Sequence, residues 1–183
     1  MTKNEIRTKY LSIRNNIENR YDKSRNMSDR FLSLISASNY NIIALYKSIG
    51  SEFDTNYLLD RLNYLGKTIC LPKILGKDLV FIKYINGDEL VKNEFGIYES
   101  VLIKENVIDI KDIDLFIVPG IVFDKSMNRI GYGKSFYDRC LANAKGLKVA
   151  LIFDEQVINS LEDIENTDIK MDIIITDKHT ILK

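Results

Sequence analysis

The chain has 183 residues, of which 45% are hydrophobic and 28% are charged, and this balance excludes a disordered or fibrous protein. We expect a single domain over residues 1–183, long enough to bury a core without a metal or disulfide framework. Its 26 Lys and Arg residues equal its 26 Asp and Glu residues in number, so no surplus of positive charge supports general binding of nucleic acid.

Cysteine, histidine and hydropathy patterns exclude two further classes. Cys70 and Cys140 are far apart and His179 is the one histidine, which argues against a zinc site built from Cys and His. The N-terminus is charged where a signal peptide would be apolar, and no stretch approaches the roughly 20 apolar residues of a membrane span. We therefore expect a cytoplasmic protein that binds no membrane.

Two amphipathic helices are expected at the start of the chain. Residues 5–17 have apolar side chains at the helical spacings of three and four: Ile6, Tyr10, Ile13 and Ile17. A second helix is predicted over residues 28–36, with three apolar side chains facing inward: Phe31, Leu32 and Ile35.

Short apolar runs then alternate with helical segments. Six runs have the character of buried strands: residues 41–46, 67–71, 79–84, 114–119, 147–153 and 172–176. A helix over residues 56–65 would be capped by Thr55 and stopped by Gly66, and another helix is expected over residues 135–144. This alternation predicts an α/β fold with three layers, α/β/α, around a mostly parallel central sheet.

The connection over residues 119–139 has the highest density of functional residue types. It links a buried strand to a helix, and ligands of such sheets bind outside the carboxyl ends of the strands. Gly131 and Gly133 permit close approach of the backbone to a phosphate, while Arg129 and Lys134 add positive charge. Asp138 lies about one turn into the helix, where it could reach a magnesium ion.

Two common phosphate-binding motifs do not match this connection. A P-loop ending in Gly133-Lys134-Ser135 would need a glycine where Asn128 stands. A dinucleotide-binding GxGxxG motif would need a third glycine where Phe136 stands. By itself, Gly131-Tyr132-Gly133 is therefore a weak signal, and a plain tight turn before a helix would also explain it.

Segments along nearly the whole chain resemble the 5-formyltetrahydrofolate cyclo-ligase family. Residues 119–139 resemble the family signature PGxAFDxxGxRLGYGGGYYDR. The resemblance lies in four stretches: Pro119-Gly120, Phe123-Asp124, Arg129-Ile130-Gly131-Tyr132-Gly133 and Phe136-Tyr137-Asp138-Arg139. Other segments agree in order and spacing: Lys3 and Arg7 followed by Arg14, residues 51–55 (SEFDT), residues 95–99 (FGIYE), and residues 168–172 (DIKMD) with Ile175-Thr176.

The resemblance implies a reaction that consumes ATP and requires Mg²⁺. In it, 5-formyltetrahydrofolate closes to 5,10-methenyltetrahydrofolate with release of ADP and phosphate, through a phosphorylated iminium at N5. This chemistry needs a phosphate cradle, a metal and in-line positioning more than covalent help from the protein. We expect a monomer whose partners are these small molecules.

The resemblance also implies roles for individual residues. ATP would be bound by Lys3, Arg7, Arg129, Gly131, Tyr132, Gly133, Lys134, Ser135 and Tyr137, with Arg129 and Lys134 acting in catalysis. The folate would be bound by Ile49, Glu52, Asp54, Tyr98, Glu99, Tyr132 and Phe136. Magnesium would be held by Asp138 and Asp168, with Asp172 as an alternative to Asp168.

Ordinary structural roles compete with several of these assignments. Lys3 and Arg7 lie four residues apart and could form a basic helix face exposed to solvent. Arg14 is not included among the expected site residues. Glu52 and Asp54 could instead decorate or cap the helix that starts at residue 56.

The sequence departs from the family pattern at three positions. Lys134 and Ser135 replace glycines of the GYGGG run, and Ser100 replaces a proline, so the Glu99 assignment is less secure. These departures leave two alternatives open: a nucleotide-binding regulatory or structural protein without turnover, or an ATP-dependent kinase or ligase with another small substrate.

Overall fold

The computed structural model describes residues 1–36, 39–162 and 164–183, and within them an eight-stranded sheet forms the centre of the molecule. Its strands are β1 (Ile42–Ala44), β2 (Thr68–Leu75), β3 (Asp78–Tyr84), β6 (Val107–Ile108), β7 (Leu115–Ile117), β10 (Leu147–Leu151), β12 (Ile173–Ile175) and β13 (Thr180–Leu182). Their order is β13-β12-β10-β7-β1-β2-β3-β6. The five strands from β12 to β2 pair in parallel, and β13, β3 and β6 add antiparallel edges.

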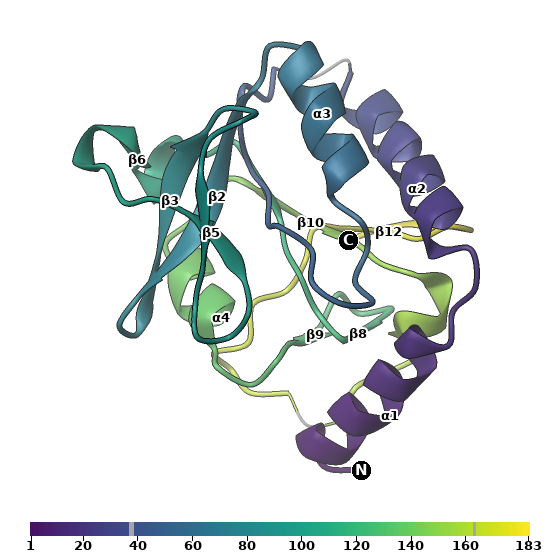
Figure 1. Ribbon diagram of the computed structural model, residues 1–183. Coiled ribbons are helices and arrows are strands. Elements are labelled where there is room, and N and C mark those ends of the chain that lie inside the picture. Colours follow the sequence, from purple (N-terminus) through teal and green to yellow (C-terminus); the bar gives the residue numbers. More distant parts are fainter. Residues whose placement is uncertain (37–38, 163) are drawn as a thin grey trace.

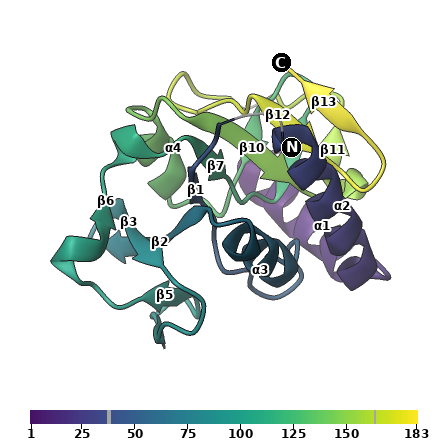
Figure 2. The same cartoon turned by 90° about the horizontal axis from the view of Figure 1, so that it is seen from above.

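Helices cover both faces of this sheet, which confirms the predicted α/β architecture. They are α1 (Lys3–Asn15), α2 (Arg20–Ile35), α3 (Asn56–Tyr64) and α4 (Phe136–Leu141). Figures 1 and 2 show α2 and α3 side by side on one face and α4 on the opposite face, while α1 lies apart from them near β8 (Val122–Asp124) and β9 (Arg129–Ile130). No helix of the described residues is both long and apolar enough to cross a membrane.

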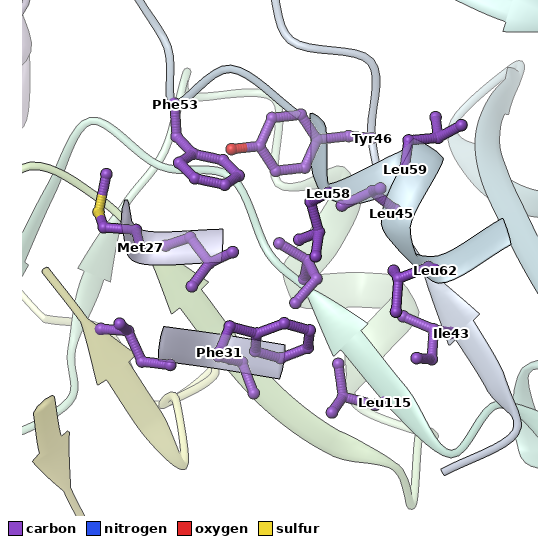
Figure 3. Packing of buried hydrophobic residues seen from close by; sticks show 14 of the residues in the cluster. Met27, Phe31, Ile43, Leu45, Tyr46, Phe53, Leu58, Leu59, Leu62 and Leu115 are labelled. Carbon is purple, nitrogen blue, oxygen red and sulfur yellow. The ribbon is translucent and has the colours of Figure 1, made fainter. Parts of the chain in front are cut away.

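Alternation along the strands of the main sheet separates two of the three core clusters, and the third contains Ile6, Val122, Ile130 and Leu161. In β1, Ile43 faces the α2–α3 side and Ala44 the α4 side, because successive side chains of a strand point to opposite faces. On the first side, Met27 and Phe31 of α2 meet Leu58 and Leu62 of α3 over the sheet (Figure 3).

Two helix predictions need correction at their ends. α2 begins at Arg20, eight residues before the expected start, and its first two turns place the small polar side chain of Ser24 inward. α4 ends at Leu141 rather than at residue 144. Thr55 is the N-terminal cap residue of α3, as expected, but its hydroxyl accepts a hydrogen bond from Ser48 N (3.1 Å) and does not cap the helix.

Several short strands were not predicted from the sequence. They are β4 (Leu90–Lys92), β5 (Tyr98–Ser100), β6, β8, β9, β11 (Val157–Ile158) and β13. Each has two or three residues, too few to show a period of two. β4 and β5 form a hairpin, while β11, β8 and β9 form a small separate sheet.

The sheet order creates a natural binding position between β1 and β7. From β1 the chain continues through α3 to β2 on one side, and from β7 it continues through α4 to β10 on the other side. Neighbouring strands whose connections diverge in this way leave a crevice at their carboxyl ends.

Candidate active site

A cavity of about 1080 Å³ lies at this crevice. Tyr46 and Lys47, just after β1, and Pro119, just after β7, contribute to its wall. Further lining residues come from α1, the segment between β1 and α3, β2, β3, the β4–β5 hairpin, β9, α4 with the loop before it, and residues 165–169. Segments far apart in the sequence therefore meet at one site.

The cavity brings together most of the residues singled out from the sequence. These are Lys3, Arg7, Ile49, Glu52, Glu99, Arg129, Gly131, Tyr132, Gly133, Lys134, Ser135, Phe136, Tyr137, Asp138 and Asp168. Asp54 and Tyr98 lie outside the lining, as does Asp172, whose carboxylate accepts a hydrogen bond from Lys148 N (2.9 Å).

One face of α1 presents basic side chains to the cavity. Lys3 Nζ lies 2.8 Å from Glu165 Oε1 and 3.1 Å from Asp168 Oδ2. Arg7 Nε donates to the carbonyl oxygen of Gly131 (2.8 Å), and its guanidinium lies 3.1 to 3.4 Å from the position that a Cβ on Gly133 would take. Gly133 has φ +86°, so its lack of a side chain serves both the backbone conformation and this close approach.

Arg129 and Asp138 form a shielded ion pair in the same region. Arg129 Nη2 donates to Asp138 Oδ1 (2.7 Å) and Arg129 Nη1 donates to the carbonyl oxygen of Pro119 (3.2 Å). The sequence alone favours Arg139 or a lysine as the partner of Asp138 in a purely structural role. The structure instead pairs Asp138 with Arg129, because the β8–β9 turn returns Arg129 to the start of α4.

The opposite part of the cavity contains a buried carboxylate. Glu52 is 8% exposed; its Oε1 accepts from the Tyr132 hydroxyl, and its Oε2 accepts from Ile49 N (2.9 Å). Burial raises the pKa of Glu52, and these two hydrogen bonds and the charge of Arg14 lower it by less. Tyr132 remains 43% exposed, so an aromatic surface adjoins the carboxylate.

Asp54 has a local structural role. Its Oδ1 accepts from Asn56 N (3.0 Å) and Asn56 Nδ2 (2.8 Å), which satisfies a free amide at the start of α3. The carboxylate that reaches the cavity in this segment is that of Glu52, two residues earlier.

Glu99 joins the β4–β5 hairpin to the main sheet. Its carboxylate accepts from Ile74 N (3.0 Å), Asn93 Nδ2 (2.8 Å) and Lys73 Nζ (3.2 Å). The hairpin thereby holds Phe95 at the rim of the cavity, where Lys134 Nζ lies 5.6 Å from the centre of its ring. Tyr98, the neighbour of Glu99 on β5, is 47% exposed.

Several lining residues and one residue behind the lining were not expected from the sequence. Tyr46 and Lys47 could have been found, because they directly follow a predicted strand at its carboxyl end. Glu165 and Phe95 lie in irregular segments that offer no such signal. Arg14, which is not among the expected site residues, is 3% exposed and donates to the Tyr132 hydroxyl from Nη2 (2.9 Å).

The donor set suits a magnesium ion that arrives with a phosphate ligand. The described residues contain no group of three or more His, Cys, Asp or Glu side chains that could hold a metal ion. Mg²⁺ is usually held by one or two carboxylates together with substrate phosphates and water. Asp138 and Asp168 both line the cavity beside cationic side chains, so they fit that arrangement.

Known proteins resemble this chain over most of its length. A family model described as the 5-formyltetrahydrofolate cyclo-ligase family matches residues 1–177. The 5-formyltetrahydrofolate cyclo-ligase of Haemophilus influenzae is 31% identical over 165 residues, which cover 86% of this chain and 88% of that relative. The Escherichia coli K12 protein of the same name is 32% identical over 140 residues, or 73% of this chain and 76% of the relative.

Solved structures also resemble this fold. The 5,10-methenyltetrahydrofolate synthetase of Aquifex aeolicus has a TM-score of 0.88 at 32% sequence identity, with 100% of this chain and 93% of that chain covered. A 5,10-methenyltetrahydrofolate synthetase from Mycoplasma pneumoniae has a TM-score of 0.78 at 23% identity, with 97% and 99% covered, and supports the fold alone.

Proposed function

The chain belongs to the 5-formyltetrahydrofolate cyclo-ligase family, and from this premise we propose that its cavity closes 5-formyltetrahydrofolate to 5,10-methenyltetrahydrofolate with consumption of ATP. One observation supports this assignment most strongly. The cavity has a cationic part that includes the carboxylates of Asp138, Glu165 and Asp168 and, beside it, an aromatic part with the buried carboxylate of Glu52. A triphosphate with its metal suits the first part, and a pteridine ring suits the second.

We assign the phosphates of ATP to the cationic part. Lys3, Arg7, Arg129 and Lys134 would neutralise them, and Gly131 and Gly133 would let the backbone approach closely. Arg129 Nε is buried and has no hydrogen-bond partner among the described residues, so it retains a donor for a ligand oxygen. Ser135 and Tyr137 would complete the wall of this part.

We assign magnesium to Asp138 and Asp168. The ion would offset charge on the phosphates and hold them in a defined geometry. Because Asp138 is paired with Arg129 and Asp168 with Lys3, binding would require these cations to share the carboxylates or to turn toward the phosphates.

We assign the folate to the aromatic part. Glu52 would accept hydrogen bonds from the amino and ring N–H groups of the pteridine, while Tyr132 and Phe136 offer aromatic surface and Ile49 an apolar contact. For this role we favour Glu52 over Asp54, because Glu52 lines the cavity and Asp54 binds Asn56. Phe95 would cover the ring from the hairpin, which Glu99 anchors.

The proposed reaction proceeds in two displacements. The formyl oxygen attacks the γ-phosphorus of ATP and ADP leaves, which gives a phosphorylated iminium at N5. N10 then attacks the formyl carbon and loses its proton, and phosphate leaves as the ring closes. Arg129 and Lys134 would stabilise charge on the transferred phosphoryl group. We propose that a monomer of one domain is the active unit, since residues of a single chain supply both parts of the cavity.

An absorbance assay of product formation tests this proposal. The purified protein is mixed with 5-formyltetrahydrofolate, ATP and Mg²⁺, each reactant is omitted in turn, and the near-ultraviolet absorbance of the methenyl product is followed. A rise that needs all three is expected. Folate binding without turnover would favour a regulatory protein, and ATP hydrolysis without folate binding would favour a ligase or kinase for another substrate.

A further inference from the structure

A buried arginine lies behind the aromatic part of the cavity. Arg14, on α1, is 3% exposed and donates from Nε to Ser51 Oγ (3.1 Å), from Nη1 to the carbonyl oxygen of Gly120 (3.4 Å) and from Nη2 to the Tyr132 hydroxyl (2.9 Å). In the described part of the chain it forms no direct ion pair with a carboxylate. Because a guanidinium stays charged in proteins, this buried charge needs a counter-charge at longer range.

Arg14 determines which way the Tyr132 hydroxyl points. A guanidinium can only donate, so the hydroxyl oxygen must accept from Arg14 Nη2. The single proton of the hydroxyl is then free for Glu52 Oε1. Arg14, Tyr132 and Glu52 therefore form a chain of hydrogen bonds with one direction.

This chain leaves Glu52 oriented toward the cavity with acceptor capacity unused. Oε1 accepts from Tyr132 and Oε2 accepts from Ile49 N, so both oxygens are held in place. Each carboxylate oxygen has two lone-pair sites, which leaves one on each oxygen for a ligand. Two parallel N–H donors on a planar ring would fit that pair.

We propose that Arg14 is a positioning residue for folate recognition, which acts through the Tyr132 hydroxyl to hold the Glu52 carboxylate for the paired N–H donors of the pteridine ring. The proposal rests on the proposed function. It assigns Arg14 no contact with the substrate, so the effects of its loss should appear in folate affinity and not in ATP affinity.

The charges around Glu52 give the proposal a second readout. Arg14 from α1, Tyr132 from the loop after β9, Tyr46 from the segment after β1 and Tyr137 from α4 are the titratable or charged groups that act on or respond to this carboxyl. Of these, Arg14 is the only cation, and its charge lowers the pKa of Glu52 against the larger effect of burial. Removal of Arg14 should therefore raise the pH needed to ionise Glu52 and to bind folate.

Titration calorimetry with 5-formyltetrahydrofolate on the full chain tests the proposal. Arg14→Gln should weaken folate binding at least about tenfold, since it removes a charged donor from this network alone. In the assay of product formation, its KM for ATP should stay within about twofold of the wild-type value. The acid limb of folate affinity against pH should move to higher pH. Arg14→Lys, which keeps the charge, should leave that limb closer to that of the wild type.

Tyr132→Phe measures whether Arg14 acts through the hydroxyl. It should weaken folate binding by itself, and the double variant with Arg14→Gln should bind little worse than Arg14→Gln alone, because both changes break one chain. Fully additive losses would contradict this route.

Arg20→Gln is the matched control for loss of a neighbouring arginine. Arg20 Nη1 donates to the carbonyl oxygens of residues 14, 15 and 17 at the end of α1, which is a structural role. An equal loss of folate affinity in Arg20→Gln, or unchanged affinity and pH profile in folded Arg14→Gln, would overturn the proposal. If the wild type itself forms no product and binds no folate, the proposed function fails first.

Discussion

At the scale of single residues, Ser135 replaces a glycine of the family's GYGGG run, and its backbone adopts a conformation that favours glycine. Its φ is 52°, in the left-handed region that glycine adopts freely. Serine restricts the backbone more than the glycine of the family pattern does, and Ser135 adopts the conformation in which that restriction matters. Ser135 borders the cavity, so the strain lies beside the proposed phosphate site.

We expect Ser135→Gly to stabilise the protein slightly. A left-handed conformation costs a non-glycine residue about 1–2 kcal/mol, and glycine loses about 0.5–1 kcal/mol through its freer unfolded state, so the net gain is at most about 1.5 kcal/mol. Thermal unfolding measures it. Asn19→Gly is the matched control, since Asn19 has φ 53° but asparagine tolerates this region better, and its gain should be smaller.

Glu52 should make stability depend on pH in an unusual direction. Burial raises its pKa in the folded state above the unfolded value, so the folded state binds more protons in the interval between the two values. The contribution of Glu52 to stability is therefore complete below its unfolded pKa and is lost as pH rises through its folded pKa.

Glu52→Gln should remove this dependence. The difference in melting temperature, variant minus wild type, should grow in favour of the variant over an interval that begins at about pH 4.3, the ordinary pKa of a glutamate, and extends to higher pH. Thermal unfolding across that interval checks the sign. A difference that shrinks with rising pH would show that Glu52 is stabilised as a carboxylate, and folate affinity should fall in the variant in either case.

At the scale of elements, the β4–β5 hairpin depends on polar contacts more than on a shared core. Val91, Phe95 and Tyr98 are exposed, whereas Glu99 is buried and binds β2 and Asn93. Residues 95–99 (FGIYE) are recognisable in the sequence by their resemblance to the family. The hairpin itself could not be predicted, because strands of three residues are too short to show alternation of apolar and polar side chains. Its position follows from the contacts of Glu99, which only the folded chain displays.

We expect Glu99→Gln to loosen this hairpin. The NH2 group of glutamine replaces one carboxylate oxygen and cannot accept, so the side chain loses either the bond from Lys73 or the bonds from Ile74 and Asn93, and Phe95 should cover the cavity less well. The KM for folate should rise several-fold with little change in kcat, because the lost hydrogen bond positions the hairpin and does not contact the substrate. Amide hydrogen exchange over residues 90–100 should also become faster. Glu94→Gln, at the exposed turn of the same hairpin, should change neither quantity.

Helix α2 shows why one element boundary could not be predicted. Its apolar stripe starts only at Met27, because the earlier turns bury Ser24, whose hydroxyl accepts from Asp54 N (3.0 Å). A small polar residue facing a core has no signature in hydrophobic periodicity. The helix therefore looks shorter in the sequence than in the structure.

At the scale of the whole molecule, the mostly parallel sheet was predictable and its edges were not. Ile43, Leu115 and Val149 belong to apolar runs that need cover on both faces. In contrast, β13 pairs antiparallel with β12 at the sheet edge, and its Thr180–Leu182 segment is largely exposed. The position of the cavity could be predicted from the carboxyl ends of the strands. The hydrogen bonds of Arg14 could not, because they depend on the packing of α1 against the loop after β9.

Ligand binding should join distant segments into one protected unit. Lys3 on α1 binds Glu165 and Asp168, so a nucleotide with Mg²⁺ that occupies this region touches the start of the chain and residues 165–168 together. We expect hydrogen exchange to slow in both segments when ATP and Mg²⁺ are added, and the melting temperature to rise with ligand concentration. Protection confined to the loop after β9 would contradict the placement of ATP against α1.

The face of α1 that bears Lys3, Arg7 and Arg14 extends from the cationic part of the cavity to the aromatic part. Arg7 holds the carbonyl of Gly131 and Arg14 holds the hydroxyl of Tyr132, while Lys3 lies farther along, at the phosphate side. The helix rises about 16 Å from Lys3 to Arg14, and each inserted residue rotates the rest of the helix by about 100°. In the proposed placement, the separation of the two substrates is set by helical register, and a one-residue insertion between Arg7 and Arg14 would uncouple them by rotating Lys3 and Arg7 relative to Arg14.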